Sequence, residues 1–396
     1  MISLAEAQHD VWGSAQALEV VSLAAGSALG LWVASDVASS LDVPPFDNSA
    51  VDGFAVQSSQ TSAPNARLRV LGTQGAGVEC GLNVVEGTAL RIMTGASIPV
   101  GADAVVMIED CELVGDSVVV GRAVRPGAHI RRRAEDVGRG DTVIRSGQRV
   151  TPAVVGIVSM LGHRNIEVVR RPVVGVLSTG DELVEPGSQR SETQIYDSNR
   201  HMLLACCSAV GAETVDLGCV PDGESVIKRR LLDATEVCDV VLSSGGVSMG
   251  EFDYVKKVLG EIGQMRWMQV AIKPAKPLAF GTIGSTPVVG LPGNPVSSLV
   301  SFELFARPLI KVLMGDPHPC RAVTMARCER AMVAAPDKTV FARVRLSVRD
   351  GETWAEPVSG QGSHQLGSMA AANGLAVVHP NQSINAGEAI ETFRID

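Results

Sequence analysis

Residues 286–315 read TPVVGLPGNPVSSLVSFELFARPLIKVLMG, and this stretch decides the fold class. An apolar run up to Leu291 predicts a buried strand, and a short loop of Pro, Gly and Asn follows it. The apolar-periodic residues after the loop predict a long helix. A strand that passes through a polar loop straight into a helix is the repeating unit of α/β folds.

The same unit recurs in the residues upstream. The expected strands end in polar or glycine residues and comprise 171–179, 214–218, 239–246 and 286–294. The expected helices that alternate with them comprise 197–211, 223–235, 252–263 and 294–315. This alternation predicts a doubly wound parallel α/β sheet covered by helices on both faces.

The flanking residues follow other patterns. Short β-type runs separated by Gly and Pro predict a small β domain within 64–128. Helical patterns at 3–15, with a Ser3/Glu6 capping box, at 26–37 and at 151–163 predict a discontinuous helical domain around it. The predicted multidomain α/β chain therefore has a helical domain (1–40 plus 139–170), an inserted β domain (41–138), an α/β domain (171–316) and a C-terminal β domain (317–396).

Length and composition exclude several classes of protein. At 396 residues the chain is too long for one ordinary core, and its net charge of −9 argues against a nucleic-acid platform. The N-terminus lacks the order of a signal peptide, and no apolar run is long enough to span a membrane. The 8 cysteines show no C-x-x-C spacing, so we expect reduced thiols in a cytoplasmic, soluble protein.

Polar residues gather where each expected strand ends. In an open α/β sheet, ligands bind beyond the carboxyl ends of the strands. The candidate residues at these ends are Ser178, Thr179, Gly180, Glu182, Asp222, Ser243, Gly245, Gly246, Asp253, Pro292, Gly293, Asn294 and Pro295. Glycines and hydroxyls beside helix starts suit a phosphate, although each loop by itself could simply cap a helix.

The carboxylates among these residues need a reason to lie beside an anion. Glu182, Asp222 and Asp253 would repel a phosphate unless a divalent cation lay between them. Oxygen-only ligands are the ligands that Mg²⁺ prefers. The loops therefore predict a metal-bridged anion site, with Mg²⁺ or another divalent cation.

Basic residues occur in two further motifs. Lys273 and Lys276 lie between prolines in AIKPAKPLAFG (271–281), a placement that favours contact with an anionic substrate over a solvated turn. Arg131, Arg132 and Arg133 in HIRRRAEDV (129–137) either form a solvated surface or reach an anion in a cleft or across a dimer. Sequence reasoning leaves both interpretations open.

The segment VPPFDNSAVDGFAV (43–56) combines prolines, aspartates, an asparagine and a glycine with apolar residues. These residue types favour turns over the interior of a strand or helix. By itself the segment is either a connection between domains or a functional loop.

Several motifs together resemble one known family. They are PPFDNSAVDGFAV, RIMTGASIP, GAHIRRRAEDV, LSTGDEL, IYDSNR, SSGGVSMGEFDYVK, AIKPAKPLAFG, GLPGNPVSSLVSF and GQGSH, in this order between residues 44 and 364. The chain is similar to the molybdopterin molybdenumtransferase family, the MoeA-type enzymes that include the E domain of gephyrin. The resemblance implies four domains, an elongated homodimer and a cleft to which both subunits contribute.

The resemblance also implies an activity. Family members insert molybdenum from molybdate into adenylylated molybdopterin with the help of Mg²⁺ or another divalent cation, and AMP leaves. The implied partners are these two substrates, the molybdopterin adenylyltransferase that precedes the enzyme and recipient molybdoenzymes. No nucleic acid or membrane is implied.

Site residues are carried over by motif position. The implied catalytic residues are Asp52, Glu182, Asp253 and Lys273, with Glu182 and Asp253 on the metal. The implied substrate-binding residues include Thr94, Asp222, Pro292, Pro295 and Ser363. In this interpretation, the turn-rich segment around Asp52 carries a carboxylate to a cleft and faces the partner subunit.

The chain departs from the family pattern at a few positions. Ala134 and Ala275 stand where the family usually has glycine, and Val51 and Phe54 replace Met and Tyr. Gln269 stands where the family has a lysine, and Arg266 could substitute for it.

Three rival interpretations stay open. An adenylyltransferase that activates molybdopterin with ATP resembles 172–316 alone, so the additional domains argue against it. A receptor-clustering scaffold need not keep Glu182 and Asp253. A paralogue without turnover is the third, which Gln269 keeps open.

Overall fold

The computed structural model describes residues 1–245 and 254–396. These residues divide into two compact units. The large unit comprises 1–34, 147–151 and 165–396, and the small unit comprises 35–146 and 152–164. The four domain boundaries predicted from the sequence stay a prediction.

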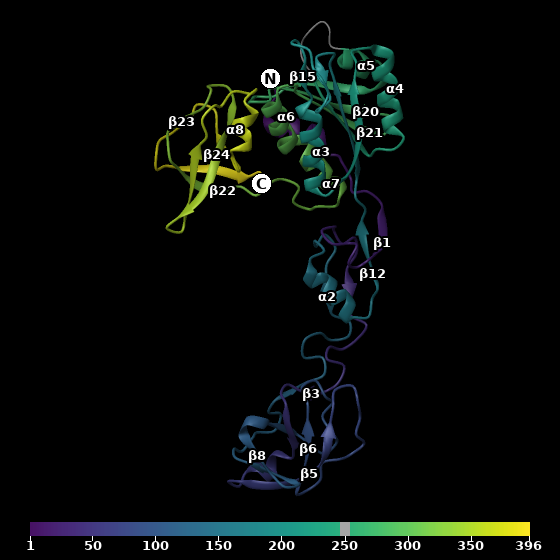
Figure 1. Ribbon diagram of the computed structural model, residues 1–396, viewed down its shortest axis with the longest axis vertical. Coiled ribbons are helices and arrows are strands. Elements are labelled where there is room, and N and C mark those ends of the chain that lie inside the picture. The colour runs from purple at the N-terminus through teal and green to yellow at the C-terminus, as the bar shows by residue number, and fades with distance from the viewer. Residues whose placement is uncertain (246–253) are drawn as a thin grey trace. The chain divides into compact units, whose positions relative to one another are not determined.

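A six-stranded sheet forms the centre of the large unit (Figure 1). Its strands, in spatial order, are β16 (Glu213–Val220), β13 (Val173–Thr179), β17 (Val240–Ser244), β21 (Thr286–Leu291), β20 (Pro277–Ile283) and β18 (Gln264–Gln269). The first four are parallel, and β20 is antiparallel to both of its neighbours. The expected parallel core is therefore confirmed, whereas sequence analysis missed β18 and β20.

Helices cover this sheet on both faces (Figure 1). Leu231 of α4 (Glu224–Thr235) and Val258 of α5 (Tyr254–Ile262) pack on sheet residues such as Leu177 and Val241 in one apolar core. The other helices are α3 (Ser198–Val210), α6 (Pro295–Ser301), the π-helical turn η3 (Phe302–Ala306) and α7 (Arg307–Leu313). Each expected α/β helix is present within a few residues of its expected bounds, and α3 ends at Gly211, whose φ of 99° only glycine adopts without strain.

The C-terminal residues form a closed β structure in the large unit. Its strands, in order, are β19 (Ile272–Lys273), β24 (Thr339–Arg349), β25 (Glu352–Pro357), β22 (Thr324–Cys328), β28 (Ala389–Arg394) and β26 (Gly374–Val378). A further pairing of β24 with β26 closes the sheet around a core that includes Val344 and Ile390. This confirms the expected C-terminal β domain.

The N-terminal residues differ in part from expectation. Helix α1 (Leu4–Trp12) forms as predicted, with both hydrogen bonds of the Ser3/Glu6 capping box. The predicted helix over 26–37 is wrong, because this segment consists of turns and isolated bridges after β1 (Val20–Ala24). Strand β1 pairs with β12 (Asn165–Val169), and the apolar residues Ala28, Leu31 and Val33 are buried without a helix.

The small unit contains a six-stranded sheet of its own. Its strands, in order, are β7 (Ala104–Met107), β4 (Gly53–Val56), β6 (Thr88–Ile92), β5 (Ala66–Gln74), β9 (Ser117–Val120) and β8 (Cys111–Val114). Two short pairs flank it, β3 (Asn48–Ser49) with β10 (Ile130–Arg131) and β2 (Val37–Ala38) with β11 (Thr142–Ile144). Helix α2 (Pro152–Met160) confirms the helix expected near 151–163.

The remaining elements are short: η1 (Ser58–Thr61), η2 (Ile108–Asp110), β14 (Leu183–Val184), β15 (Ile195–Tyr196), β23 (Met332–Val333), α8 (Leu366–Ala370) and β27 (Ser383–Ile384). Of the helices in the described residues, none has the length and apolar character needed to cross a membrane. The cysteines are free thiols.

Candidate active site

Three parallel strands end side by side at one edge of the large-unit sheet. Ser178 of β13 pairs in register with Ser244 of β17, and Ser244 pairs with Leu291 of β21. The residues that follow each strand therefore emerge at the same edge, as sequence analysis expected. Ser178 and Ser243 are fully buried here, and Thr179 and Ser244 are nearly so.

The loop after β13 carries the exposed carboxylate of Glu182. Gly180 has a φ of 141°, and a Cβ on it would lie 2.3 Å from Oε2 of Glu182. This φ favours glycine because residues with a side chain rarely adopt it, and a side chain here would also displace the Glu182 carboxylate. The backbone of Glu182 is held by Ile195, whose N–H donates to its carbonyl at 2.8 Å.

The loop after β16 lies against the loop after β13. The N–H of Asp222 donates to Oδ1 of Asp181 at 3.1 Å, and the N–H of Gly180 donates to the carbonyl of Val220 at 3.4 Å. Asp222 and Glu182 thus lie exposed on adjacent loops. Burial raises the pKa of the nearby Cys219 thiol, which the Ser178 hydroxyl offsets in part.

Asn199 ties two further loops together. Its Nδ2 donates to Oγ of Ser244 at 2.9 Å and to the carbonyl of Gly293 at 2.7 Å. Gly245, with a φ of 92°, donates its N–H to Leu291 at 3.0 Å and lies close to Gly293. Sequence analysis did not select Asn199 as a site residue, although it lies in the quoted IYDSNR motif.

A buried ion network stabilises the same edge of the sheet. Arg200 is 2% exposed and contacts Asp197, Asp216 and Glu185, while the Ser178 hydroxyl donates to Asp197. Burial by itself would lower the pKa of Arg200, but the hydrogen bonds that Arg200 donates to Asp216 and Asp197 outweigh it, so the net pKa is raised. This network fixes the start of α3, because Asp197 is also the cap that accepts the N–H of Arg200.

Lys273 and Lys276 are exposed in the turn that precedes β20. Because β20 runs antiparallel to β21, with Ala279 opposite Gly290, its first residues lie at the edge where β21 ends. The N–H of Val270 donates to Lys276 at 2.8 Å and closes the turn. Gln269 pairs with Pro277 at that edge, whereas Arg266 lies further along β18 and is paired with Asp10 at 2.5 Å.

Lys273 also links this turn to the C-terminal β structure. It lies in β19, where it pairs with Val340 of β24. The loop that contains Ser363 also contacts the α/β domain. The carbonyl of Ser363 accepts the N–H of Val296 in α6 at 3.1 Å. The C-terminal β domain is therefore connected to the two loops that bear Lys273 and Pro295.

Arg343 is a candidate residue that sequence analysis missed. It is 1% exposed on β24, and its Nη2 donates to Gly360 at 2.6 Å beside the loop of Ser363. Its Nε is buried without a partner. A charged strand residue after Phe341 carried no sequence signal that it would be buried.

The small unit holds Asp52 and Thr94. Oδ1 of Asp52 accepts the N–H of Thr94 at 2.7 Å and its hydroxyl at 2.8 Å. Both hydrogen bonds lower the pKa of Asp52, and the bond from the backbone N–H has the larger effect. The next residue is Gly53, and a glycine is required there because β4 approaches β7 closely. A Cβ at this position would lie 1.9 Å from the carbonyl oxygen of Val106.

The three arginines of the small unit are not equivalent. Arg132 pairs with Asp47 at 2.6 Å and Arg133 pairs with Asp42 at 2.5 Å. These two therefore form ion pairs within the chain, and their contact with an anion in a cleft or across a dimer stays a prediction. Arg131 lies exposed on β10.

Two alanines occupy left-handed backbone. Ala134 has a φ of 61° and Ala275 a φ of 76°. These are the positions where the sequence has alanine in place of a more usual glycine. The conformation is retained in spite of the missing glycine, at a cost of about 1–2 kcal/mol for each residue.

Two predicted site residues, Gly246 and Asp253, lie outside the described residues. Within 1–245 and 254–396, no group of three His, Cys, Asp or Glu side chains is arranged to hold a metal ion. The carboxylates of Glu182 and Asp222 are exposed on adjacent loops. Their hard oxygen atoms are the type of ligand that Mg²⁺ prefers.

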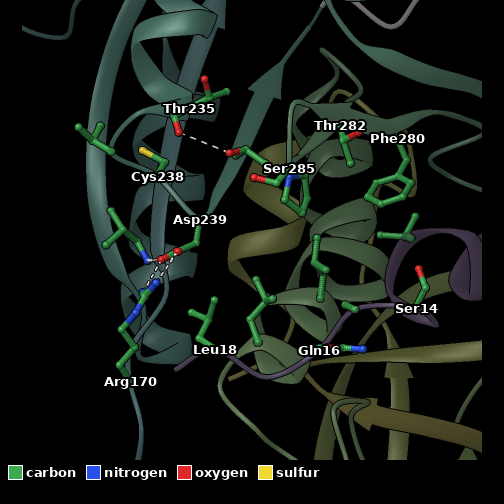
Figure 2. Close-up of a pocket in the computed structure, with 18 of the residues that line it drawn as sticks. Ser14, Gln16, Leu18, Arg170, Thr235, Cys238, Asp239, Phe280, Thr282 and Ser285 are labelled. Atoms are coloured by element: carbon green, nitrogen blue, oxygen red, sulfur yellow. Dashed lines mark hydrogen bonds and ion pairs between the residues drawn. The ribbon is translucent and has the colours of Figure 1, made fainter. Parts of the chain in front are cut away.

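A cavity of about 810 Å³ lies at the other edge of the sheet (Figure 2). It is lined by residues at the strand starts, such as Val173 and Thr286, and no predicted site residue lines it. On one wall, Arg170 donates two hydrogen bonds to Asp239, at 2.6 and 2.7 Å, as Figure 2 shows. The candidate site at the strand ends is therefore separate from this cavity.

Three family patterns match successive parts of the chain. They are the MoeA N-terminal region (domain I and II) over residues 2–162, the probable molybdopterin binding domain over 175–312 and the MoeA C-terminal region (domain IV) over 325–393. Together they match most of the described chain.

Named relatives and a solved structure agree with these patterns. The chain is 38% identical to "Molybdopterin molybdenumtransferase" of Haemophilus influenzae, over 90% of this chain and 89% of that protein. It is 37% identical to "Molybdopterin molybdenumtransferase 2" of Mycobacterium tuberculosis, over 95% of each. A crystal structure of the molybdopterin biosynthesis MoeA protein from Pyrococcus horikoshii superposes with a TM-score of 0.83 at 31% identity, over 100% of this chain and 99% of that one.

Proposed function

Since this chain belongs to the MoeA-type molybdopterin molybdenumtransferase family, we propose that it transfers molybdenum from molybdate to adenylylated molybdopterin. The place of the chain in molybdenum cofactor biosynthesis and its class as a transferase follow from the family. In the proposed reaction, water hydrolyses the adenylyl phosphoanhydride and AMP leaves, and the dithiolene sulfurs ligate molybdenum while a molybdate oxygen departs with their protons as water.

The observation that carries this proposal is the single sheet edge that Asn199 helps to assemble. Hydroxyls and backbone N–H groups follow β13, β17 and β21 there, and Asn199 fixes two of the three loops. Such groups bind phosphate and adenylate oxygens. The exposed ammonium groups of Lys273 and Lys276 at the same edge neutralise an anionic substrate.

We assign the carboxylates to a divalent cation, proposed to be Mg²⁺. Glu182 and Asp253 would hold it, and Asp222 on the adjacent loop would orient the substrate. When bound, such a cation polarises a phosphoanhydride and screens its charge. Loss of either carboxylate would therefore leave phosphate binding possible and slow the cleavage of the anhydride.

Arg343 and Ser363 supply a proposed contact for an oxyanion. The unpartnered Nε of Arg343 is a buried cationic donor beside the loop that bears Ser363. A guanidinium matches the geometry of an oxyanion such as molybdate.

Asp52, Thr94 and Arg131 belong to the small unit, and we propose that they complete the site of a partner subunit in a homodimer. The exposed, fully ionised carboxylate of Asp52 suits a group that acts on a ligand of another chain. The cytoplasmic location and a transfer of the product to molybdoenzymes also stay predictions.

A direct assay tests the proposed activity. The purified chain is incubated with adenylylated molybdopterin, Mg²⁺ and molybdate, and released AMP and the finished cofactor are measured. We expect AMP release that depends on molybdate and that fails in Glu182→Gln. If the chain instead adenylylates molybdopterin with ATP, or releases no AMP above the rate without protein, the proposal is wrong.

A further inference from the structure

A second cavity, of about 300 Å³, lies in the large unit beside the ends of two helices. Its floor comes from the last turn of α3, with Cys206, Ala209 and Val210, and its walls from η3, α7 and the segment after α7. In a parallel α/β sheet, helices start at the edge where the strands end and finish at the opposite edge. This cavity therefore lies away from the candidate active site, and none of the predicted site residues lines it.

Basic residues dominate its lining. Arg149, Arg307, Lys311 and Arg321 line the cavity, and Glu303 and Asp396 are the acidic residues among its lining. The side chain of Asp396 is already paired, because its Oδ1 accepts the Nε of Arg394 at 2.8 Å. The four basic residues outnumber the two acidic residues of the lining, and Nη1 of Arg321 also donates to the main-chain oxygen of Asp396 at 3.5 Å.

Glu303 is saturated by one arginine. It is 7% exposed, and its two oxygens accept Nε and Nη2 of Arg321 at 2.9 and 3.1 Å. Nε of Arg307 lies 3.8 Å from the same carboxylate, beyond hydrogen-bond distance, and its Nη1 donates to the carbonyl of Pro319 at 2.8 Å. Arg307 is itself one of the residues that line the cavity.

Lys311 is the strongest sign that an anion belongs here. It is 8% exposed, and the nearest carboxylate oxygen, Oδ2 of Asp316, is 3.8 Å from its Nζ, too far for a hydrogen bond. Burial lowers the pKa of Lys311, Asp316 raises it, and Arg307, Arg149 and Arg321 lower it further. Asp316 offsets part of the repulsion between this buried ammonium group and the guanidinium groups, and an anion in the cavity would offset more of it.

We propose that this cavity binds a tetrahedral oxyanion of the phosphate class, held by Lys311, Arg307 and Arg321. This goes beyond the proposed function, because the site lies at the opposite end of the helices from the substrate loops. The volume exceeds that of a single phosphate ion, so a small phosphate ester also fits. Cations that line one cavity can give an anion charge-assisted hydrogen bonds, for which we expect a dissociation constant on the order of 0.1 mM.

The first test is calorimetric titration of the full chain with inorganic phosphate and, in a second arm, with glycerol 3-phosphate. We expect saturable binding in at least one arm, and a rise in Tm of about 2 °C at 10 mM ligand. Tighter binding of the ester assigns the site to an esterified phosphate, and tighter binding of the ion assigns it to free phosphate. No binding in either arm overturns the proposal.

Variants separate this cavity from the active site. Lys311→Met keeps the length of the side chain and removes its charge, so we expect the fold to be retained. The affinity for phosphate should fall at least ten-fold, because the anion loses about one charge-assisted hydrogen bond. Lys338→Met, the same change in the C-terminal β domain, serves as the matched control and keeps full affinity. Unchanged affinity in Lys311→Met contradicts the proposal.

Location is tested independently of any variant. In crystals soaked with arsenate, the anomalous signal should peak within hydrogen-bond reach of Nζ of Lys311. A peak only at the loops after β13 and β21 would assign the bound anion to the active site and reject this second one.

Discussion

Nδ2 of Asn199 lies 2.7 Å from the carbonyl oxygen of Gly293 and donates a hydrogen bond to it. The two residues are far apart in the sequence, at the start of α3 and after β21. Through its second bond, to Ser244, the same amide group also holds the end of β17. One buried side chain therefore sets the spacing of the loops to which we assign phosphate binding.

The first prediction concerns this link. Asn199→Ala should lower kcat/KM for adenylylated molybdopterin at least ten-fold, because the loop of Gly293 loses its anchor. The free energy of unfolding should fall by about 1–3 kcal/mol, the cost of losing buried hydrogen bonds. Steady-state kinetics and thermal unfolding measure the two effects. Asn165→Ala, at an exposed position of β12, is the control and should change neither.

The second prediction concerns the ionisation of Asp52. The hydrogen bonds that Asp52 accepts from Thr94 lower its pKa, so the carboxylate stays ionised when the pH falls below the usual range of aspartate. The stability that the ionised carboxylate gives the fold is lost only as the pH falls through this lowered pKa. Thr94→Val removes the hydroxyl donor but keeps the N–H donor, so the pKa of Asp52 should rise part of the way. Carboxylate NMR titration measures it.

Thr73→Val, on the exposed side of β5, provides the control for this titration. It should leave the pKa of Asp52 unchanged. An Asp52 pKa that is the same in Thr94→Val and in the unsubstituted chain would show that the hydroxyl contributes nothing.

The third prediction concerns the two alanines with positive φ. Ala134→Gly and Ala275→Gly should each stabilise the fold by about 0.5–1 kcal/mol, because the relief of left-handed strain exceeds the entropy cost of glycine. Ala205→Gly, in the exposed middle of α3, should destabilise by about 1 kcal/mol. Denaturant unfolding of the three variants distinguishes these opposite signs, and a loss of stability in both loop variants would contradict the strain argument.

The fourth prediction concerns the glycine beside Asp52. Gly53→Ala should destabilise the small unit by more than about 2 kcal/mol, because its Cβ would lie 1.9 Å from the carbonyl oxygen of Val106 and push β4 away from β7. Gly75→Ala is matched in chemistry and meets no atom within 4 Å, so it should be tolerated. Amide exchange in β4 and β7 reports the difference.

Much of the fold could be predicted because the signals are local. Each strand of the parallel core is a short apolar run followed by Gly, Ser or Pro, and helices α1 and α3 start at Ser3 and Asp197, whose side chains cap them. The helix predicted over 26–37 is wrong although the apolar residues of this segment have helical spacing. In the structure, turns bury the same apolar residues. Spacing reports burial, and it does not distinguish one backbone path from another when the segment is short.

Some parts of the site depend on contacts that no local pattern records. Arg343 looks like an ordinary polar strand residue, and only the loop of Gly360 that folds over it makes it buried. The same holds for Asn199, whose partners come from two distant loops, and for Lys311, whose neighbours come from four segments.

By itself the sequence determined the order of the parallel strands and of the helices between them, the family and the identity of the polar loops, because backbone propensities and turn residues act over a few positions. Only the tertiary structure decided which of those polar groups lack partners, since pairing depends on chain segments that meet in space and not in sequence. Arg132 and Arg133 found carboxylates in that way, whereas Nε of Arg343 did not.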